Sequence, residues 1–413
     1  MKKPIILTVI LSILSGSLSA QTSDKYQENI KKLKPFKIDI PQSILDDLHL
    51  RLKQTRWPAE IKGSGWNYGS NLGYMKELTS YWLNQYDWRK QEAKLNAFHQ
   101  FKAEVDGVNI HFIYEHGKGP NPTPIILING WPDSFYRYEK LIPMLTDPAK
   151  YGGDPNDSFD VIVPSLGAGF SDNIPVDQGP LLKTTGKLLM KLMTEVLGYK
   201  KFAAAGGDGG GVTSQILATI NPDAIIGLHL TDIGYHNTFV PDPSKLSKAS
   251  QEFLTTLQQR FQPEGAYVAM LMTKPLTFNY GLADSPVGIA SLIVEKFRDW
   301  SDCGGDVEKS FTKDELLTNI MLYWVSDLGG TAIYGYALEG RNPSIAPGTK
   351  ITVPVALALP PGDLTPVPPK DLAELSLNVQ HYMVLPHGGH FVALEDPKPL
   401  AEDMWAFFKT LKK

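Results

Sequence analysis

A carboxylate, Asp208, stands at the centre of the glycine-dense stretch AAAGGDGGGVTSQ, residues 203–215. The residues before it are typical of a strand and those after it of a helix, so the acid is expected at the tip of a sharp turn. In a strand-to-helix elbow the nucleophile is held above the sheet, and the residues two before and two after it must be small. Gly206 and Gly210 occupy those positions. The alternative is a glycine-rich turn whose aspartate caps the following helix.

The type of nucleophile limits the chemistry. The chain contains no Gly-x-Ser-x-Gly, so an elbow here carries a carboxylate where serine is usual. An aspartate nucleophile attacks carbon and forms an ester intermediate. This favours substrates with a strained or good leaving group on carbon, such as epoxides or halides.

An ester of this kind needs a base that activates water, and His390 in LPHGGHFVALEDP, residues 385–397, is the candidate. It follows a predicted strand and precedes a helix, and the order nucleophile, acid, histidine is that of many hydrolases. His387 is a weaker candidate because it lies nearer the strand. The acid that orients the base is predicted to be Asp363, in the loop of ALALPPGDLTPVP, with Asp232 as the alternative.

The stretch LINGWPDSFYRYEKL, residues 127–141, supplies the remaining element. Its strand ends at a turn that should lie beside the elbow. We expect the backbone N–H of Trp131, together with that of Gly209, to form an oxyanion hole for the tetrahedral intermediate. Backbone donors do not depend on the side chain, so glycine can serve at position 209.

These residues need a framework, and short strands alternating with helices predict a mostly parallel α/β sheet flanked by helices. The predicted organisation is a signal peptide at 1–20, an N-terminal segment at 21–104, an α/β core at 105–232 and 346–413, and a helical insertion at 233–345 between the two parts of the core. Asp106-Gly107 predicts a hairpin turn within FKAEVDGVNIHFIYEHG, residues 101–117.

The N-terminus and the composition limit where the protein is expected in the cell and what it is expected to bind. MKKPIILTVILSILSGSLSA has two lysines, a short apolar run and small residues, as a secretory signal has, which predicts a secreted or periplasmic protein with no stable membrane span after cleavage. An uncleaved anchor is the alternative, although the run is short for a bilayer. The net charge of -4 gives no basic footprint for nucleic acid. No metal-ligand cluster is evident, so no metal and no cofactor are expected.

The chain resembles the microsomal-type epoxide hydrolases, a family with the α/β-hydrolase fold. The resemblance rests on FKIDIPQSILDDLHLRL with TRWP, on GWPDSFYRYEKLIPMLTDP, GGDGGG and GGHFVALEDP in the core, and on TKPLTFNYGLADSPVGIASLIVEKFRDW with YWVSDLGGTAIYGYALE in the insertion. It implies an α/β-hydrolase core, a helical cap and an N-terminal meander. It also implies hydrolysis of a small hydrophobic epoxide to a vicinal diol.

The resemblance further implies two tyrosines in the cap that protonate the epoxide oxygen, at Tyr267 and Tyr336, with Tyr334 a rival for the second. The chain departs from the family where histidine, glycine and tryptophan are usual, at Asn129, Asp133 and Gly209 respectively. Two other functions remain open: a dehalogenase-like hydrolase that uses the same aspartate, and a catalytically silent binding protein on the same scaffold. The oligomeric state is not predicted.

Overall fold

The computed structural model describes residues 26–412, except 166, 175–178 and 327–333. The predicted signal peptide, residues 1–20, therefore lies outside the described residues. No helix in the described part of the chain is both long and apolar enough to cross a membrane.

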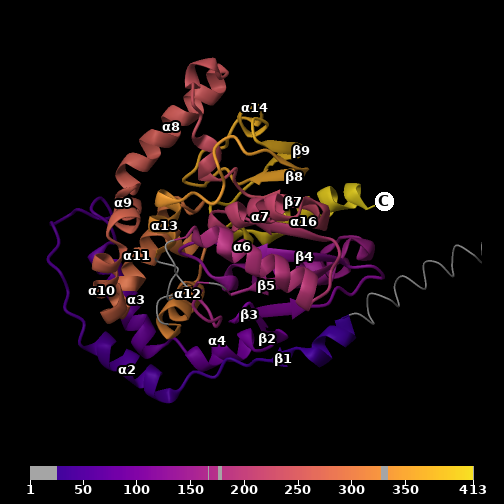
Figure 1. The fold of residues 1–413 in the computed structure, drawn as a ribbon. Helices are drawn as coiled ribbons and strands as arrows, with labels where there is room; N and C mark the ends of the chain where they lie inside the picture. The colour runs from indigo at the N-terminus through magenta and orange to yellow at the C-terminus, as the bar shows by residue number, and fades with distance from the viewer. Residues whose placement is uncertain (1–25, 166, 175–178, 327–333, 413) are drawn as a thin grey trace, which may run out of the picture.

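A nine-stranded sheet forms the centre of the molecule, in the order β1-β2-β3-β5-β4-β6-β7-β8-β9 (Figure 1). The pairs from β1 to β5 are antiparallel, and all pairs from β5 to β9 are parallel. The mostly parallel sheet predicted from the sequence is thus confirmed. The strands are β1 Lys34–Pro35, β2 Gln100–Val105, β3 Val108–Glu115, β4 Thr123–Ile128, β5 Phe159–Pro164, β6 Phe202–Gly206, β7 Ile225–Leu230, β8 Ile351–Leu359 and β9 Leu377–Val384.

The hairpin between β2 and β3 shows how local sequence sets the register. Val105 pairs with Val108 across the two-residue turn. Asp106 and Gly107 both have positive φ, 49° and 81°, as the favoured two-residue hairpin turns require. The predicted turn at Asp106-Gly107 is confirmed.

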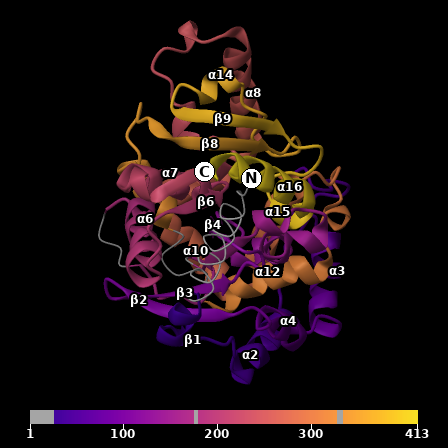
Figure 2. The ribbon, with the colours of Figure 1, turned by 90° about the vertical axis from the view of Figure 1, so that its right-hand side faces the viewer.

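Helices cover both faces of the sheet, as Figure 2 shows with the sheet turned. Helices α6 and α7 lie on one face, and α5, α15 and α16 lie on the other. Consecutive residues of β4 accordingly belong to two different hydrophobic cores, as expected for a strand buried on both sides. The core helices are α5 Leu141–Thr146, α6 Leu181–Lys191, α7 Gly209–Ile220, α14 Lys370–Ala373, α15 Val392–Glu395 and α16 Pro397–Leu411.

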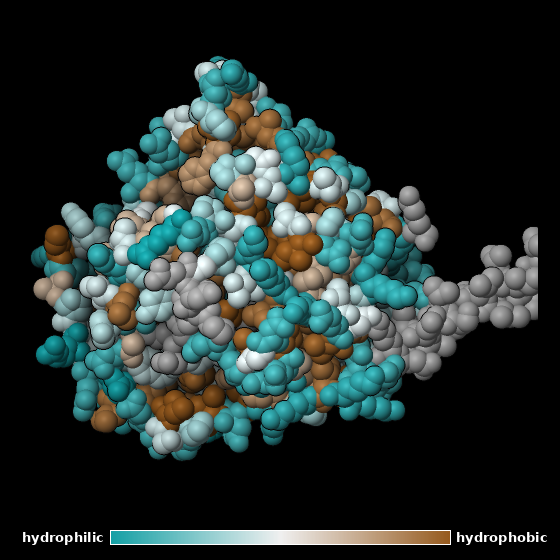
Figure 3. Space-filling model, viewed as in Figure 1, coloured by the Kyte–Doolittle hydropathy of each residue, from teal (hydrophilic) through white to brown (hydrophobic). Residues whose placement is uncertain are grey.

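A group of six helices between β7 and β8 corresponds to the predicted helical insertion and is called the cap below. It stands at the left of Figure 1. The cap helices are α8 Lys248–Glu264, α9 Ala266–Thr273, α10 Pro275–Asp284, α11 Pro286–Asp299, α12 Lys313–Val325 and α13 Gly335–Arg341. On the face shown in Figure 3, hydrophobic residues form separate small patches within a largely hydrophilic surface.

The N-terminal helices α2 Gln42–Lys53, α3 Leu72–Asn84 and α4 Trp88–Leu95 precede the sheet's hairpin, and α2 and α3 pack on the cap. The Ser70 hydroxyl donates to the Ser291 carbonyl at 2.6 Å, and the Tyr81 hydroxyl donates to Asp314 at 2.9 Å. These contacts fix the cap from outside. On its inner side α12 contacts the loop after β4, where the Asn319 amide donates to the Pro132 carbonyl at 2.9 Å.

Candidate active site

Asp208 occupies the turn between β6 and α7 in a conformation that few side chains adopt. Its φ and ψ are 53° and -134°, and a non-glycine residue there costs about 1–3 kcal/mol. The residues two before and two after it cannot carry side chains: a Cβ on Gly206 would lie 2.6 Å from the Ile128 carbonyl oxygen, and one on Gly210 would lie 1.9 Å from the same atom. The backbone geometry is that of the elbow expected from the sequence, with the carboxylate at its tip.

The loop after β4 presses against this carboxylate. The Trp131 N–H donates to Asp208 Oδ1 at 3.0 Å. A Cβ on Gly130 would lie 2.4 Å from the same oxygen, so glycine is required for this approach. Gly209 begins α7, and a Cβ there would meet no atom nearer than 3.9 Å. Glycine at 209 is therefore not demanded by sterics, and it leaves free space beside the carboxylate.

His390 and Asp363 are brought together at the ends of β9 and β8. His390 Nδ1 lies 3.2 Å and 3.3 Å from the two carboxylate oxygens of Asp363. His390 Nε2 is buried and has no hydrogen-bond partner within the described part of the chain. Burial alone would lower the pKa of His390, but the charge and hydrogen bond of Asp363, aided by the charge of Asp208, raise it to about 9.

Asp232, the alternative acid, has a different set of contacts. Its two oxygens accept the N–H of Asp208 at 2.6 Å and the N–H of Gly234 at 2.7 Å. Burial raises the pKa of Asp232 to about 6, helped by the nearby charges of Asp208 and Asp363. Asp232 thus holds the backbone of the elbow, and it is Asp363 that contacts the histidine ring.

Tyr267 and Tyr336 meet above the same loop. Their ring centroids are 6.0 Å apart, and both contact Trp131, which stacks on Tyr267 at 5.2 Å and meets Tyr336 edge-on at 5.9 Å. Burial raises the pKa of both phenols, and the charge of Asp208 raises both further. Both hydroxyls are therefore protonated at neutral pH. Tyr334, the rival, is half-buried and packs against the hydrophobic cores.

Comparison with known proteins agrees with this site geometry. The sequence profile described as "Epoxide hydrolase N terminus" matches residues 33–138. A Stigmatella aurantiaca protein provisionally named an epoxide hydrolase is 39% identical, with 92% of this chain and 85% of that protein covered. Epoxide hydrolase 1 of Oryctolagus cuniculus is 32% identical, with 91% and 89% covered. The chain belongs to the epoxide hydrolase family.

Solved structures of the epoxide hydrolase family share the fold. The crystal structure of juvenile hormone epoxide hydrolase from the silkworm Bombyx mori superposes with a TM-score of 0.78 at 29% identity. The superposition covers 93% of this chain and 96% of that one. Family and fold expected from the sequence are confirmed.

Sequence reasoning missed several groups that surround the predicted residues. Trp300, at the end of α11, meets His390 edge-on at 5.2 Å, and its carbonyl accepts the His390 N–H at 2.7 Å. Glu395 accepts the backbone N–H of Gly389 and Phe391, which fixes the histidine loop from below. An acceptor such as Glu395, five residues beyond His390, gives no distinctive sequence signal.

Sequence reasoning also missed a buried lysine, Lys296. Lys296 lies inside the cap with its ammonium 4.8 Å from the ring centroid of Tyr267. It is 3.2 Å from both Glu264 and Glu295. Of the described residues, those two acids and Asp299 form a group that could hold a cation. The lysine already supplies positive charge there, so the arrangement is an ion-pair cluster that supports Tyr267.

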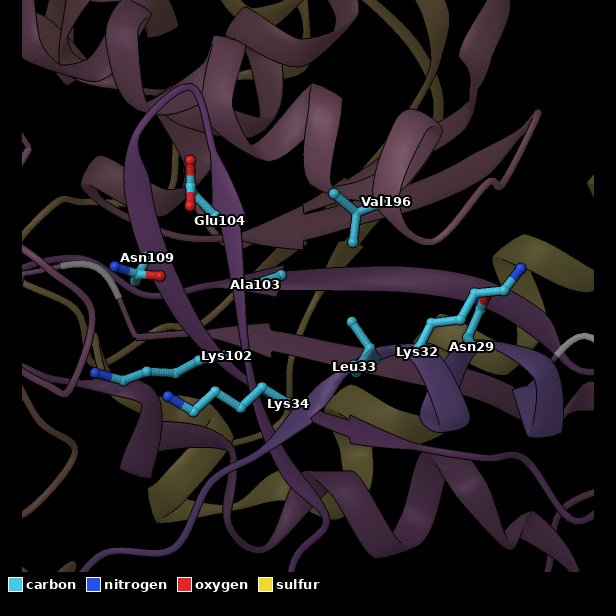
Figure 4. Close-up of a pocket in the computed structure, with 9 residues that line it drawn as sticks. All are labelled: Asn29, Lys32, Leu33, Lys34, Lys102, Ala103, Glu104, Asn109 and Val196. Atoms are coloured by element: carbon cyan, nitrogen blue, oxygen red, sulfur yellow. The ribbon is translucent and has the colours of Figure 1, made fainter.

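A surface cavity of about 520 Å³ lies far from these residues, at the outer edge of the sheet (Figure 4). Figure 4 shows the ammonium groups of Lys34 and Lys102 extending to one side and that of Lys32 to the other, so they do not converge on one point. None of the candidate catalytic residues lines it. The cavity is lined by Asn29, Lys32, Leu33, Lys34, Lys102, Ala103, Glu104, Asn109 and Val196.

Proposed function

We propose that this protein hydrolyses small hydrophobic epoxides to vicinal diols through an ester on Asp208. The observation that carries the proposal is the contact of two protonated phenols with the ring of Trp131, whose N–H donates to Asp208. The His390–Asp363 pair interacts electrostatically with the same carboxylate. In the first step an Asp208 oxygen attacks an oxirane carbon and the carbon–oxygen bond breaks. Tyr267 and Tyr336 donate hydrogen bonds to the departing oxygen, and one of them transfers its proton, so an alcohol forms.

The second step regenerates the enzyme. His390, held by Asp363, takes a proton from water, and the resulting hydroxide attacks the carbonyl carbon of the Asp208 ester. The N–H groups of Trp131 and Gly209 stabilise the tetrahedral oxyanion. Its collapse breaks the bond between that carbon and the diol oxygen, which takes the proton held by His390. The proton on the regenerated Asp208 carboxyl returns to the tyrosinate, and the diol leaves.

The two phenols favour an epoxide over a halide as substrate. A halide leaves as a stable anion and needs no proton, whereas an alkoxide is strongly basic and gains from a phenol donor. The ring of Tyr336 contacts the rings of both Trp131 and Tyr267, which favours Tyr336 over Tyr334 as the second proton donor. The free space at Gly209 favours substrates with bulk beside the reacting carbon.

A single-turnover reaction tests the proposal. Excess enzyme reacts with styrene oxide in oxygen-18 water, and intact and peptide mass spectrometry locate the label. We expect the label in the Asp208 carboxylate, and an Asp208→Asn variant should form no diol at the start. Diol formed at the wild-type rate by that variant would refute the mechanism. Halide release from alkyl halides, measured in parallel, tests the dehalogenase alternative.

We also propose that residues 1–20 direct the chain out of the cytoplasm and are then removed, a proposal that the signal-like pattern of the sequence supports. Expression in a Gram-negative host followed by fractionation tests it. We expect the periplasmic or secreted protein to begin near Gln21 by mass spectrometry. Full-length protein retained in the membrane fraction would support the anchor instead.

A further inference from the structure

A buried ion pair lies directly behind the two catalytic loops. Asp133 and Arg137 are each only 2% exposed, and the Arg137 Nη1 donates to Asp133 Oδ2. Asp133 belongs to the loop after β4, and Arg137 to the short helical turn η1, Phe135–Tyr138. Asp133 Oδ1 and Arg137 Nε have no hydrogen-bond partner among the described residues. A buried pair that leaves polar atoms unsatisfied is poorly suited to stabilising the fold, which suggests another purpose.

The guanidinium joins the segments that carry the nucleophile and the base. Arg137 Nη2 donates to the main-chain carbonyl of His390 at 2.7 Å. The same nitrogen would lie 3.4 Å from a Cβ on Gly207, so it also lies against the elbow that holds Asp208. Asp133 in turn is held from the cap, because the Tyr323 hydroxyl donates to its carbonyl at 2.8 Å. One side chain therefore bridges the loop after β4, the elbow and the histidine loop.

The charge of Arg137 also acts on the histidine. The charged groups that interact with His390 are Asp363 at the end of β8, Asp208 at the elbow, Arg137 of η1, Asp133 of the loop after β4, and Asp232 at the end of β7. Glu395 of α15 lies beneath the loop and bonds to its backbone. Of these groups Arg137 is the cation, and it lowers the pKa of His390. It therefore favours the neutral imidazole that must accept a proton from water.

We propose that Arg137, anchored by Asp133, is a positioning residue for ester hydrolysis: it fixes the His390 loop against the elbow without contributing to formation of the ester. This inference rests on the proposed two-step function. Ester formation needs Asp208 and the phenols. Among the described residues, the Arg137 side chain donates hydrogen bonds to Asp133 and to the His390 carbonyl, and to neither Asp208 nor the phenols. Hydrolysis needs the imidazole at a fixed place and in its neutral form, and both depend on the guanidinium.

The test separates the two steps. Styrene oxide reacts with excess Arg137→Met protein, and stopped-flow tryptophan fluorescence with quenched-flow mass spectrometry follows formation and loss of the ester on Asp208. We expect ester formation within about twofold of wild type and hydrolysis slowed at least about tenfold, so that esterified enzyme accumulates. The pH at which hydrolysis reaches half its maximum should move upward, because a cation that opposes protonation of His390 is gone. Arg137→Lys should restore the pH dependence in part.

A second variant covers the case in which Arg137→Met leaves Asp133 buried and unpaired and so does not fold. The double variant Asp133→Leu with Arg137→Met replaces the pair by apolar groups of similar size, and it should show the same slow hydrolysis. Arg89→Met is a matched control, because Arg89 likewise pairs with an acid, Glu92, and donates to a distant carbonyl, that of Ile40. Both steps should be unchanged in it.

The outcomes are distinct. Hydrolysis at the wild-type rate in both Arg137 variants, or an equal loss of both steps, would overturn the positioning role. If wild-type protein forms no ester on Asp208 at all, the proposed function itself fails, which the same mass spectra reveal.

Discussion

Replacing Asp363 by asparagine should change both the pH dependence of stability and the rate of one chemical step. The substitution keeps the shape of the side chain and removes its charge. Asp363 supplies the largest contributions that raise the pKa of His390 to about 9 from the ordinary 6.5. That difference corresponds to about 3 kcal/mol in favour of the imidazolium in the folded protein. Without Asp363, burial dominates and the pKa should fall below 6.5.

The sign of the pH effect follows from linkage. Because the folded-state pKa of His390 exceeds the unfolded one, its contribution to stability is fully present below pH 6.5 and is lost as the pH rises through about 9. Urea unfolding of wild type between pH 6 and 9.5 should therefore show a fall in unfolding free energy of up to about 3 kcal/mol from this group. Asp363→Asn should lack that fall. It should instead lose stability on acidification, when a buried imidazole must be charged.

The kinetic consequence tests the same reasoning independently. An imidazole without its carboxylate loses orientation, so ester hydrolysis in Asp363→Asn should slow by about 10² to 10⁴-fold, the range for general base catalysis. Ester formation should persist. Asp232→Asn is the matched control, since its amide oxygen can still accept the elbow N–H and the histidine keeps Asp363. If Asp363→Asn retained both the wild-type pH profile and the wild-type hydrolysis rate, the assigned pairing would be wrong.

Two further predictions concern the phenols and the elbow. The double variant Tyr267→Phe with Tyr336→Phe should slow ester formation by about 10² to 10⁴-fold, while hydrolysis of an ester already formed should change little. Each single variant should lose less, because one phenol donor remains. An equal loss of both steps in stopped-flow traces would contradict the role of the phenols as proton donors. Gly210→Ala should destabilise the protein by about 1–3 kcal/mol, the usual cost of overpacking, because its Cβ would lie 1.9 Å from the Ile128 oxygen. Gly209→Ala has free space and should unfold at the wild-type urea concentration, and similar midpoints for the two variants would refute the steric argument.

Local features of the site could be predicted from the sequence because they are set by neighbouring residues. The elbow at Asp208 needs small residues two positions away on each side, and the hairpin needs positive φ at Asp106-Gly107. Both requirements are visible in the sequence as residue types at fixed positions. The choice between Asp363 and Asp232 could not be made in this way. Both follow strands that are adjacent in the sheet, β8 and β7, and only the direction of each side chain separates them.

The buried charges were missed for a different reason. Asp133 and Arg137, four residues apart in a polar turn, are typical of a solvated surface. They are buried because α12 and α15, which lie far along the chain, cover the turn. Lys296 similarly occurs in a helix with charged neighbours and gives no hint that its ammonium lies on the face of Tyr267. Tertiary packing of this kind leaves no periodicity or spacing for sequence reasoning to detect.

The same electrostatics bear on how His390 would serve the proposed two-step cycle. In the free enzyme the anionic Asp208 and Asp363 hold the pKa of His390 at about 9, so the imidazole is charged at neutral pH. Ester formation removes the charge of Asp208, while Arg137 stays in place and continues to oppose protonation. In the proposed cycle the pKa of His390 should therefore fall when the ester forms, which favours the neutral imidazole at the stage that needs a base. In the proposed mechanism the charge of the nucleophile thus contributes to the pKa of the base that acts after it.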